Sequence, residues 1–538
     1  MSCIESLVFT PYLNFTSITL ISPGGIPHQE APVVGLIDED LPDAYHMECF
    51  GLEARINVLE NRVVELDREN KAVLLPDGAV IPYDTLVLTT GRQDVTAKRL
   101  GLWSPGLDPA CLNVKGFMSL DLPDLGRKLE TVVEKMNNMA TIVLYGRSIR
   151  IMAVLQNLLD MGVDSDCIEV VRFEEGLESF GSQGIDDAVM RQLKGLGISC
   201  RTNCTLVGVE LGIFDNVISV ELQQHPGGKQ ITVACSLLLC GDEVSVDPDI
   251  FQAINNSGLV YDSRLVVDLS FRTVDPNIFA GGTLTKFSRI YRRSCSNHDK
   301  YNSHEVGEAL ASSLLEAVDP LAVEVPPPET PPVFSRPRTV SGLLPGGFHY
   351  CHSKAELIGG ETGGNSFTTG STEISAGQDL NYCLVHVTDL DIVSKLVYYG
   401  SQEVEPRNLS RLVGVNQSYL LSLMRTHDTG GVKDFIKFFR QDYFSMLYHD
   451  RFGQLVLELR DLLHEGDETA IELLTALKKG IEDGQDDTWL AVSIRTAVGA
   501  GGSNIAESTR KIIEGRTLDF VRKNKALLPT FLLAELSN

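Results

Sequence analysis

The sequence predicts an α/β protein with two doubly wound units, a small β-containing segment and a helical C-terminal region. Continuous apolar runs, typical of strands buried on both faces, occur at residues 85–91 ("TLVLTTG"), 140–146 ("ATIVLYG") and 234–240 ("ACSLLLC"). An amphipathic stretch of helical length, "RSIRIMAVLQNLLDMG", follows the second run at residues 147–162. Strands that alternate with helices of this length predict parallel, doubly wound sheets.

Length, charge and cysteine content narrow the classes of function. A chain of 538 residues exceeds the size of a single core, so we expect several domains. The net charge of −26 argues against binding to nucleic acid or to anionic membranes, both of which need a basic surface. No apolar run approaches the ~20 residues of a membrane span. The 11 cysteines include no C-x-x-C pair, so we expect reduced thiols and no zinc site.

We divide the chain into five segments by composition and periodicity. They are a degenerate FAD-type Rossmann domain (1–135 and 233–320), a degenerate NAD-type Rossmann domain (136–232), a proline-rich linker (321–343), a small β-containing segment (344–404) and a helical C-terminal region (405–538). Within the fourth segment, the Gly/Ser/Thr-rich stretch 359–377 is predicted to be a loop. Within the fifth, the pattern predicts helices at 408–425, 432–466, 468–484 and 516–536.

The amino-terminal residues predict a helix ("CIESLVF", 3–9) followed by a strand ("TSITLIS", 16–22). This is the second half of a βαβ unit, so we expect the first Rossmann unit to be N-terminally incomplete, without its first strand and glycine loop. A ribose-binding second strand usually ends in Asp or Glu, whereas Ser22 and Pro23 stand at this end.

Two phrases are similar to the dinucleotide-binding phrases of FAD/NAD(P)-dependent reductases. In "GAVIPYDTLVLTTG", Gly91 occupies the place where the backbone passes close to a dinucleotide. In "IVLYGRSIRIMA", Gly146 is present, but Ser148 and Ile151 occupy the second and third glycine places of G-x-G-x-x-G. A Cβ at the second place obstructs a phosphate, and Ile151 is expected to push the helix away from the strand. We therefore expect structural Rossmann units without NAD(P).

A third phrase, "SRLVVDLSFRTVDPNIFAGG", is similar to the terminal flavin phrase of these reductases. That phrase ends in an Asp that binds the flavin arm, whereas this one ends in Gly281, Gly282 and Thr283. The backbone N–H groups of the two glycines are the remaining candidates to face a phosphate. We expect no catalytic residue, no bound FAD or NAD and no metal, and we regard Gly91, Gly146, Ser148, Ile151, Gly281 and Gly282 as vestigial cofactor positions.

Two other groups of residues have an ordinary explanation and a functional one. His349 and Cys351 share one face of a predicted strand and His352 the other, so they cannot converge on a metal ion. Phenylalanines between 435 and 452 suit either a core or a partner-binding helix face, and core packing is the default.

The sequence resembles the C-terminal half of cilia- and flagella-associated protein 61 over most of residues 3 to about 424. The resemblance is carried by residues 277–292 ("NIFAGGTLTKFSRIYR"), 298–320 ("HDKYNSHEVGEALASSLLEAVDP"), 343–353 ("LLPGGFHYCHS") and 5–27 ("ESLVFTPYLNFTSITLISPGGIP"). "AGGTLTKFSR" and "LPGGFHY" are its specific parts.

The resemblance implies a non-enzymatic structural and regulatory scaffold of the ciliary axoneme, part of the cytoskeleton in the cytoplasm. It would lie at the base of radial spoke 3, in the calmodulin- and spoke-associated complex that supports ciliary and flagellar motility. The implied partners are other subunits of this complex, radial spoke 3 and doublet microtubule proteins, with calmodulin reached through the complex. The alternatives are an FAD/NAD(P)-dependent oxidoreductase and a nucleotide-binding module without turnover.

Overall fold

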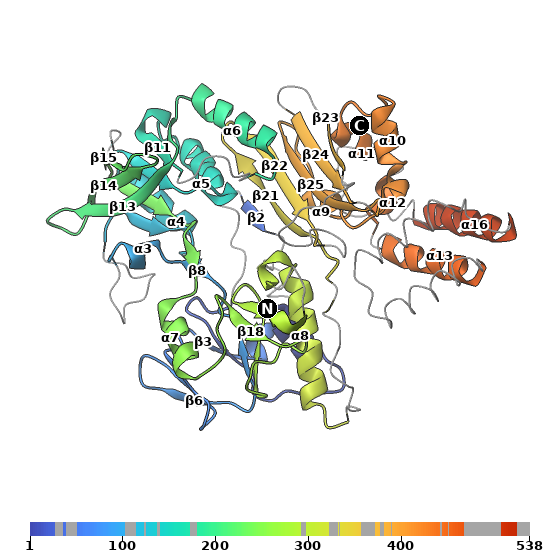
Figure 1. Ribbon diagram of the computed structural model, residues 1–538, viewed down its shortest axis with the longest axis horizontal. Coiled ribbons are helices and arrows are strands. Elements are labelled where there is room, and N and C mark those ends of the chain that lie inside the picture. Colours follow the sequence, from blue (N-terminus) through green and yellow to red (C-terminus); the bar gives the residue numbers. More distant parts are fainter. Residues whose placement is uncertain are drawn as a thin grey trace. The chain divides into compact units, whose positions relative to one another are not determined.

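The structure is a computed structural model, and it forms two compact units (Figure 1). The N-terminal unit contains residues 1–352 and 399–402, and the C-terminal unit contains residues 353–398 and 403–538. The described residues are 1–26, 36–38, 51–102, 114–122, 125–136, 140–172, 180–291, 297–321, 332, 334–356, 372–376, 381–388, 390–441, 444–449, 451–466 and 507–524.

Short parallel strand pairs and three helices form what we call the first lobe of the N-terminal unit. Its elements are α1 (Ser2–Val8), β1 (Thr19–Ile21), β3 (Asn57–Leu59), β7 (Leu86–Leu88), α7 (Pro248–Asn256), β18 (Leu265–Val267), β19 (Ile278–Ala280), β20 (Thr285–Phe287) and α8 (Ser303–Val318). The strands pair in parallel as β1–β3, β7–β19 and β18–β20, and each pair is a separate sheet among the described residues. The predicted amino-terminal helix and the strand after it are confirmed as α1 and β1.

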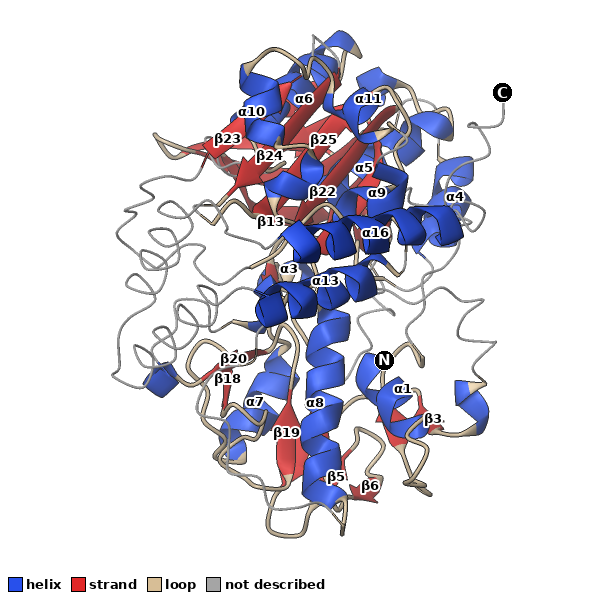
Figure 2. Cartoon of the chain, turned by 90° about the vertical axis from the view of Figure 1, so that its right-hand side faces the viewer, coloured by secondary structure: helices blue, strands red, loops and turns tan. Residues whose placement is uncertain are grey.

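An antiparallel meander, β4 (Glu65–Asp67), β5 (Ala72–Leu74) and β6 (Val80–Pro82), also belongs to the first lobe. Its buried Leu66 and Val73 pack into the same core as Phe271, Phe279 and Phe287. Figure 2 shows α8 running beside β19, and the buried side chains of α8 join this core.

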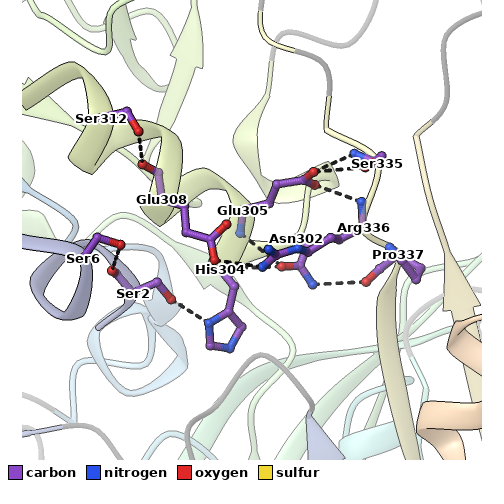
Figure 3. A network of polar contacts seen from close by, with 10 residues as sticks. All are labelled: Ser2, Ser6, Asn302, His304, Glu305, Glu308, Ser312, Ser335, Arg336 and Pro337. Atoms are coloured by element: carbon purple, nitrogen blue, oxygen red, sulfur yellow. Dashed lines mark hydrogen bonds and ion pairs between the residues drawn. The ribbon is translucent and has the colours of Figure 1, made fainter. Parts of the chain in front are cut away.

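The N-terminus of α8 fixes the chain segment that leads into the next strands (Figure 3). Asn302 caps α8, because its Oδ1 accepts hydrogen bonds from the backbone N–H groups of His304 and Glu305 at 3.1 and 3.2 Å. The Glu305 carboxylate accepts from the backbone N–H groups of Ser335 and Arg336, both at 2.9 Å. The Asn302 amide donates to the Pro337 carbonyl at 3.1 Å, so one helix end holds three consecutive residues.

The same helix holds α1. His304 Nδ1 and Ser2 Oγ are hydrogen-bonded at 2.6 Å (Figure 3). A Cβ at Gly307 would lie 2.9 Å from the Cβ of Ser2, so the glycine allows the two helices to approach closely.

A five-stranded parallel sheet forms what we call the second lobe. Its elements are β9 (Phe117–Ser119), α4 (Leu125–Lys135), β10 (Ile142–Tyr145), α5 (Ile149–Asp160), β11 (Ile168–Val171), α6 (Gln183–Gly195), β12 (Ser199–Arg201) and β16 (Leu237–Cys240). The strand order is β12-β11-β10-β16-β9, and β10, β11 and β16 are buried throughout. The apolar runs 140–146 and 234–240 therefore contain the buried strands that the sequence predicted, whereas the run 85–91 contains β7, which is only partly buried.

The second lobe extends beyond the boundaries 136–232 predicted for it. Both β9 and β16 pair within its sheet, β16 directly against β10 with Ile142 opposite Leu237. A parallel sheet gathers strands that are distant in the chain, and composition does not show which sheet such a strand joins.

An antiparallel sheet packs into the second lobe. It consists of β13 (Cys204–Leu211), β14 (Val217–Gln224) and β15 (Lys229–Ala234). Leu206, Val220 and Leu222 are fully buried with Val143 and Tyr145 of β10. The inward residues alternate with exposed ones, as expected for a sheet with one solvated face.

Two antiparallel crossover strands connect the lobes, β8 (Gln93–Asp94) and β17 (Val244–Ser245). Beside them, on α3 (Thr96–Arg99), Lys98 pairs with Asp247 at 2.6 Å and Arg99 pairs with Glu243. The Lys98 side chain is 13% exposed and that of Arg99 is 37% exposed, so the Lys98–Asp247 pair is the better shielded from solvent and contributes more to fixing the crossover.

Residues 338–343, which the sequence analysis assigned to the proline-rich linker, lie in strand β21 (Arg338–Leu344). This strand pairs with β2 (Leu36–Asp38) and is followed by β22 (Phe348–Lys354). The prolines end at Pro337, and "RTVSGLL" then has the alternating burial of a strand. The rest of the predicted linker lies mostly outside the described residues.

The C-terminal unit contains β23 (Thr372–Ala376), β24 (Asn381–Val387) and most of β25 (Val393–Gly400). The prediction of a loop at 359–377 is wrong for residues 372–376, which form β23 and pair with β24. Most of the other residues of that stretch lie outside the described part of the chain.

The rest of the described C-terminal unit is mainly helical, with four helices of four to six residues followed by two longer ones. They are α9 (Pro406–Ser410), α10 (Leu423–Asp428), α11 (Phe435–Phe439), α12 (Phe444–Leu447), α13 (Phe452–Gly466) and α16 (Glu507–Asn524). The long helices expected at 408–425 and 432–466 are therefore broken into pieces. Phe435, Phe439 and Phe444 are almost fully buried, which confirms core packing of these aromatic residues. The helical segment expected at 468–484 lies outside the described residues.

Candidate functional site

The six vestigial cofactor positions lie in two groups, one in each lobe. Gly91, Gly281 and Gly282 follow β7 and β19, which are neighbouring parallel strands. Gly146, Ser148 and Ile151 lie at the junction of β10 and α5. Both groups are at the carboxyl ends of parallel strands, where open α/β sheets bind ligands.

In the first lobe, the loop after β7 is bonded to the loop after β19. The backbone N–H of Arg92 donates to Thr283 Oγ1 at 3.1 Å. Gly91 has φ = +67°, and a Cβ there would lie 3.2 Å from the same hydroxyl oxygen. Thr283 occupies the position of the Asp that ends the flavin phrase, and its hydroxyl contacts the backbone of this chain.

The two glycines after β19 serve the fold. The Gly281 N–H, which the sequence left as a candidate to face a phosphate, donates a hydrogen bond to the Leu88 carbonyl at 3.2 Å. It is therefore not available for a phosphate. A Cβ at Gly281 would lie 3.1 Å from Leu310 Cδ2 of α8. Gly282 has φ = +81° with open space around its Cβ position, so there a glycine is favoured by the backbone turn alone.

In the second lobe, a carboxylate occupies the start of α5. Asp242 Oδ2 accepts hydrogen bonds from the backbone N–H groups of Arg147 and Ser148, the latter at 2.7 Å. These are the first N–H groups of the turn that would cradle a dinucleotide phosphate. A Cβ at Gly146 would lie 2.6 Å from Asp242 Oδ2, so the glycine makes room for the carboxylate.

Ile151 was expected to push the helix away from the strand, but its side chain packs into the space beside Gly146. It is fully buried, and a Cβ at Gly146 would lie 2.8 Å from its Cγ1. The space that Gly146 leaves at the end of β10 therefore receives both the Asp242 carboxylate and the Ile151 side chain.

The residues present do not fit FAD or NAD(P) in the ordinary mode. The N–H groups that would bind a nicotinamide dinucleotide phosphate already bind Asp242, and a second anion beside that carboxylate would be repelled. At the end of the flavin phrase, the Thr283 hydroxyl stands in place of the Asp carboxylate, and it accepts a hydrogen bond from the Arg92 N–H.

The described thiols do not form a redox centre. The eight described cysteines are all free. Burial raises the pKa of Cys200 to about 11 and that of Cys235 to about 12, and it raises the pKa of Cys240 well above its ordinary value. Protonated, buried thiols are poor nucleophiles, so these side chains suit packing.

A buried histidine packs against the aromatic side chains of the first lobe's core. His298 is 1% exposed, and its Nδ1 is hydrogen-bonded to Thr285 Oγ1 at 2.8 Å. Its ring packs on Phe287 with ring centres 4.3 Å apart. Burial, assisted by the nearby positive charge of Arg264, lowers the pKa of His298 to about 3, so the ring is neutral at pH 7.

Sequence reasoning missed Asp242 and the Arg92–Thr283 contact. Asp242 carries a usable signal, because "LLLCGD" places an acidic residue two positions after a buried parallel strand, at the edge where ligands bind. The contact between Arg92 and Thr283 joins residues 191 positions apart through a backbone N–H, and no local pattern indicates it.

Among the described residues, no group of three or more His, Cys, Asp or Glu side chains is placed to hold a metal ion. On β22 the two histidines and the cysteine of "HYCH" differ in environment: Cys351 is fully buried, whereas His349 and His352 are half-buried. None of the helices in the described part of the chain is long and apolar enough to cross a membrane.

Comparison with known proteins agrees with this geometry. Residues 16–300 match the pyridine nucleotide-disulphide oxidoreductase family, which is more than half of the chain. The chain belongs to this family. Residues 332–447 match the CFAP61 dimerisation domain.

A curated relative extends the similarity to almost the whole chain. It is cilia- and flagella-associated protein 61 of Tetrahymena thermophila, 23% identical over 99% of this chain and 39% of the relative. The chain thus spans about two fifths of the length of the relative. Together with the dimerisation-domain match, this confirms the recognised resemblance and relates the chain to a cilia- and flagella-associated protein.

Solved structures with a similar fold are reductases. One is the covalent putidaredoxin reductase–putidaredoxin complex, with a TM-score of 0.53, 17% identity, and coverage of 74% of this chain and 86% of that chain. Another is the ferredoxin reductase for the CYP199A2 system of Rhodopseudomonas palustris, with a TM-score of 0.51, 18% identity, and coverage of 76% and 94%. At this identity the likeness establishes the fold alone, which is the predicted reductase-type α/β fold.

Proposed function

We propose that this protein is a non-enzymatic scaffold of the ciliary axoneme that uses a reductase fold without its cofactors. The observation that carries the proposal is that groups of the chain itself occupy the cofactor positions. The Asp242 carboxylate binds the start of α5, and Thr283 binds the loop after β7. A fold that is kept while its ligand contacts are replaced suits a structural role.

The similarity to a cilia- and flagella-associated protein supports the place of action that we propose. The similarity to cilia- and flagella-associated protein 61 supports an axonemal location, at the base of radial spoke 3 and within the calmodulin- and spoke-associated complex. The partners in this proposal are other subunits of that complex, radial spoke 3 and doublet microtubule proteins, with calmodulin reached through the complex. The match to a dimerisation domain supports subunit contacts through residues 332–447.

Two measurements test the proposal. We expect a tagged copy expressed in a ciliated cell to remain with the axonemes after detergent extraction, and to be released together with spoke-base proteins at high salt. Loss of the protein into the detergent-soluble fraction would contradict the location.

The second measurement is steady-state oxidation of NADH or NADPH by the purified chain, with added FAD and an artificial electron acceptor. We expect no turnover above the rate without protein. Turnover at an enzyme-like rate would replace the scaffold with an oxidoreductase. Stabilisation by FAD or NADH without turnover would instead indicate a nucleotide-binding module.

A further inference from the structure

We infer that Asp242 is a built-in substitute for a ligand phosphate, and that its carboxylate closes an anion site that the second lobe otherwise retains. The inference rests on the proposed function, in which this lobe binds no dinucleotide. The closing side chain, that of Asp242, follows β16, whereas α5 follows β10.

The end of β16 delivers the carboxylate. Cys240 is opposite Tyr145, the last residue of β10, so both strands end at the same edge of the sheet. A Cβ at Gly241 would lie 2.6 Å from the Cβ of Leu120, so the chain passes this point only as glycine. Asp242 follows directly and reaches the start of α5.

The helix end has the properties of an anion site. The α5 helix has 12 residues, and its first N–H groups carry the positive end of the helix dipole. Ser148 is the N-cap residue, yet its hydroxyl makes no capping hydrogen bond, and its Oγ is buried without a partner. The acceptor for the helix start is therefore Asp242, which follows the neighbouring strand β16.

Two other helices of the N-terminal unit have local caps. In α7 the N-cap residue Asp247 accepts from the N–H groups of Asp249 and Ile250, and in α8 the N-cap residue Asn302 accepts from those of His304 and Glu305. An acceptor from another strand therefore distinguishes α5 from α7 and α8.

The carboxylate and a phosphate exclude each other. Both need the N–H groups of Arg147 and Ser148, and Asp242 Oδ2 lies within 2.6 Å of the Cβ position of Gly146. Gly146 is also the one glycine that remains of the three-glycine phrase. The structure gives it a present use, because any side chain there would overlap the carboxylate.

The test is anion rescue in the full chain. Asp242→Ala leaves two N–H groups at the start of α5 without their acceptor, and we expect the melting temperature to fall by about 2–4 °C. Acetate or inorganic phosphate should restore most of this loss at an ionic strength matched with chloride, because either anion can refill the site. The wild-type chain should show no such gain.

Asp247→Ala is the matched control, since it also removes a carboxylate that accepts two helix N–H groups and additionally loses the pair with Lys98. We expect it to be destabilised without anion rescue. Equal rescue of both variants, or no anion-dependent shift in Asp242→Ala, would overturn the inference. Asp242→Asn, which keeps the shape and one acceptor oxygen, should lose less and gain less from anions.

These outcomes are separable from failure of the proposed function. Turnover of NADH by the wild-type chain would refute the scaffold and would appear without any substitution. Absence of rescue in Asp242→Ala, with an inactive wild-type chain, would remove only the role of Asp242.

Discussion

The two lobes of the N-terminal unit share a fold family but differ in the continuity of their sheets. The second lobe has five parallel strands in one sheet, with β10, β11 and β16 buried throughout. The first lobe has three separate parallel pairs of three-residue strands among its described residues. Its order depends more on α8, which contacts β19, α1 and the segment at 335–337.

Under the proposed function, the two lobes keep a dinucleotide-binding fold in two different ways. The second lobe has a continuous core, and the Asp242 carboxylate accepts the hydrogen bonds at the start of α5, where a dinucleotide phosphate would otherwise bind. The first lobe joins two loops directly through Arg92 and Thr283, and relies on polar contacts of a long helix. We therefore expect substitutions in sheet strands to cost more in the second lobe, and substitutions in polar contacts to matter more in the first.

The largest expected effect is on the sheet of the second lobe. Leu144 of β10 is fully buried, whereas Leu86 of β7 is half-buried. Leu144→Ala should cost about 2–5 kcal/mol of unfolding free energy, and Leu86→Ala about 1 kcal/mol. Hydrogen exchange in increasing urea, read on peptides from each lobe, measures the two losses separately. Equal losses would remove the contrast between the lobes.

The next effect is a pH dependence confined to the first lobe. The folded protein keeps His298 neutral because burial lowers its pKa to about 3, whereas the unfolded chain binds a proton below about pH 6.5. Its contribution to stability is therefore complete above pH 6.5 and is lost as the pH falls towards 3. The slope is about 1.4 kcal/mol per pH unit, or about 2 kcal/mol between pH 6.5 and 5.

His298→Asn isolates this contribution, because Asn keeps a polar group near Thr285 and does not titrate. The unfolding free energy of wild type should fall more steeply than that of the variant between pH 6.5 and 5. Parallel curves for the two proteins would mean that His298 is protonated in the folded state or does not control the first lobe.

The smallest of the three effects concerns the start of α8. Asn302→Ala removes the acceptor for two helix N–H groups and the donor to Pro337, and should cost about 1 kcal/mol. Protection against hydrogen exchange should fall in α8, α1 and the peptide containing residues 335–337 together. Ser312→Ala, in the same helix and exposed, should leave all three unchanged. A loss confined to α8 would show that the helix end does not organise its neighbours.

The sequence predicted the second lobe better than the rest of the N-terminal unit. Continuous apolar runs indicate buried parallel strands, and "ATIVLYG" and "ACSLLLC" contain β10 and β16, which are buried throughout. Composition does not show which sheet a strand joins, so β9 and β16 were assigned to the wrong lobe. Ile151 was expected to prevent close packing, but the missing side chain of Gly146 accommodates it.

Residues with positive φ separate the helices of the C-terminal unit, although the apolar spacing continues across these breaks. Gly414 and Gly430 have φ values of +87° and +75°, which end a helix, and Leu421 and Ser422 also adopt positive φ. Asp434 then starts α11 by accepting from the N–H groups of Ile436 and Lys437. Buried aromatic side chains at helical spacing are retained on both sides of such breaks, so their spacing alone suggests one long helix.

The central claim is that groups of the chain itself have replaced the cofactors, and calorimetric titration of the purified full chain with FAD and with NADH tests it most directly. We expect no heat of binding for either compound up to millimolar concentration, and a purified protein without flavin absorbance near ~450 nm. Saturable binding of either compound, or a yellow protein that releases flavin on denaturation, would contradict the claim.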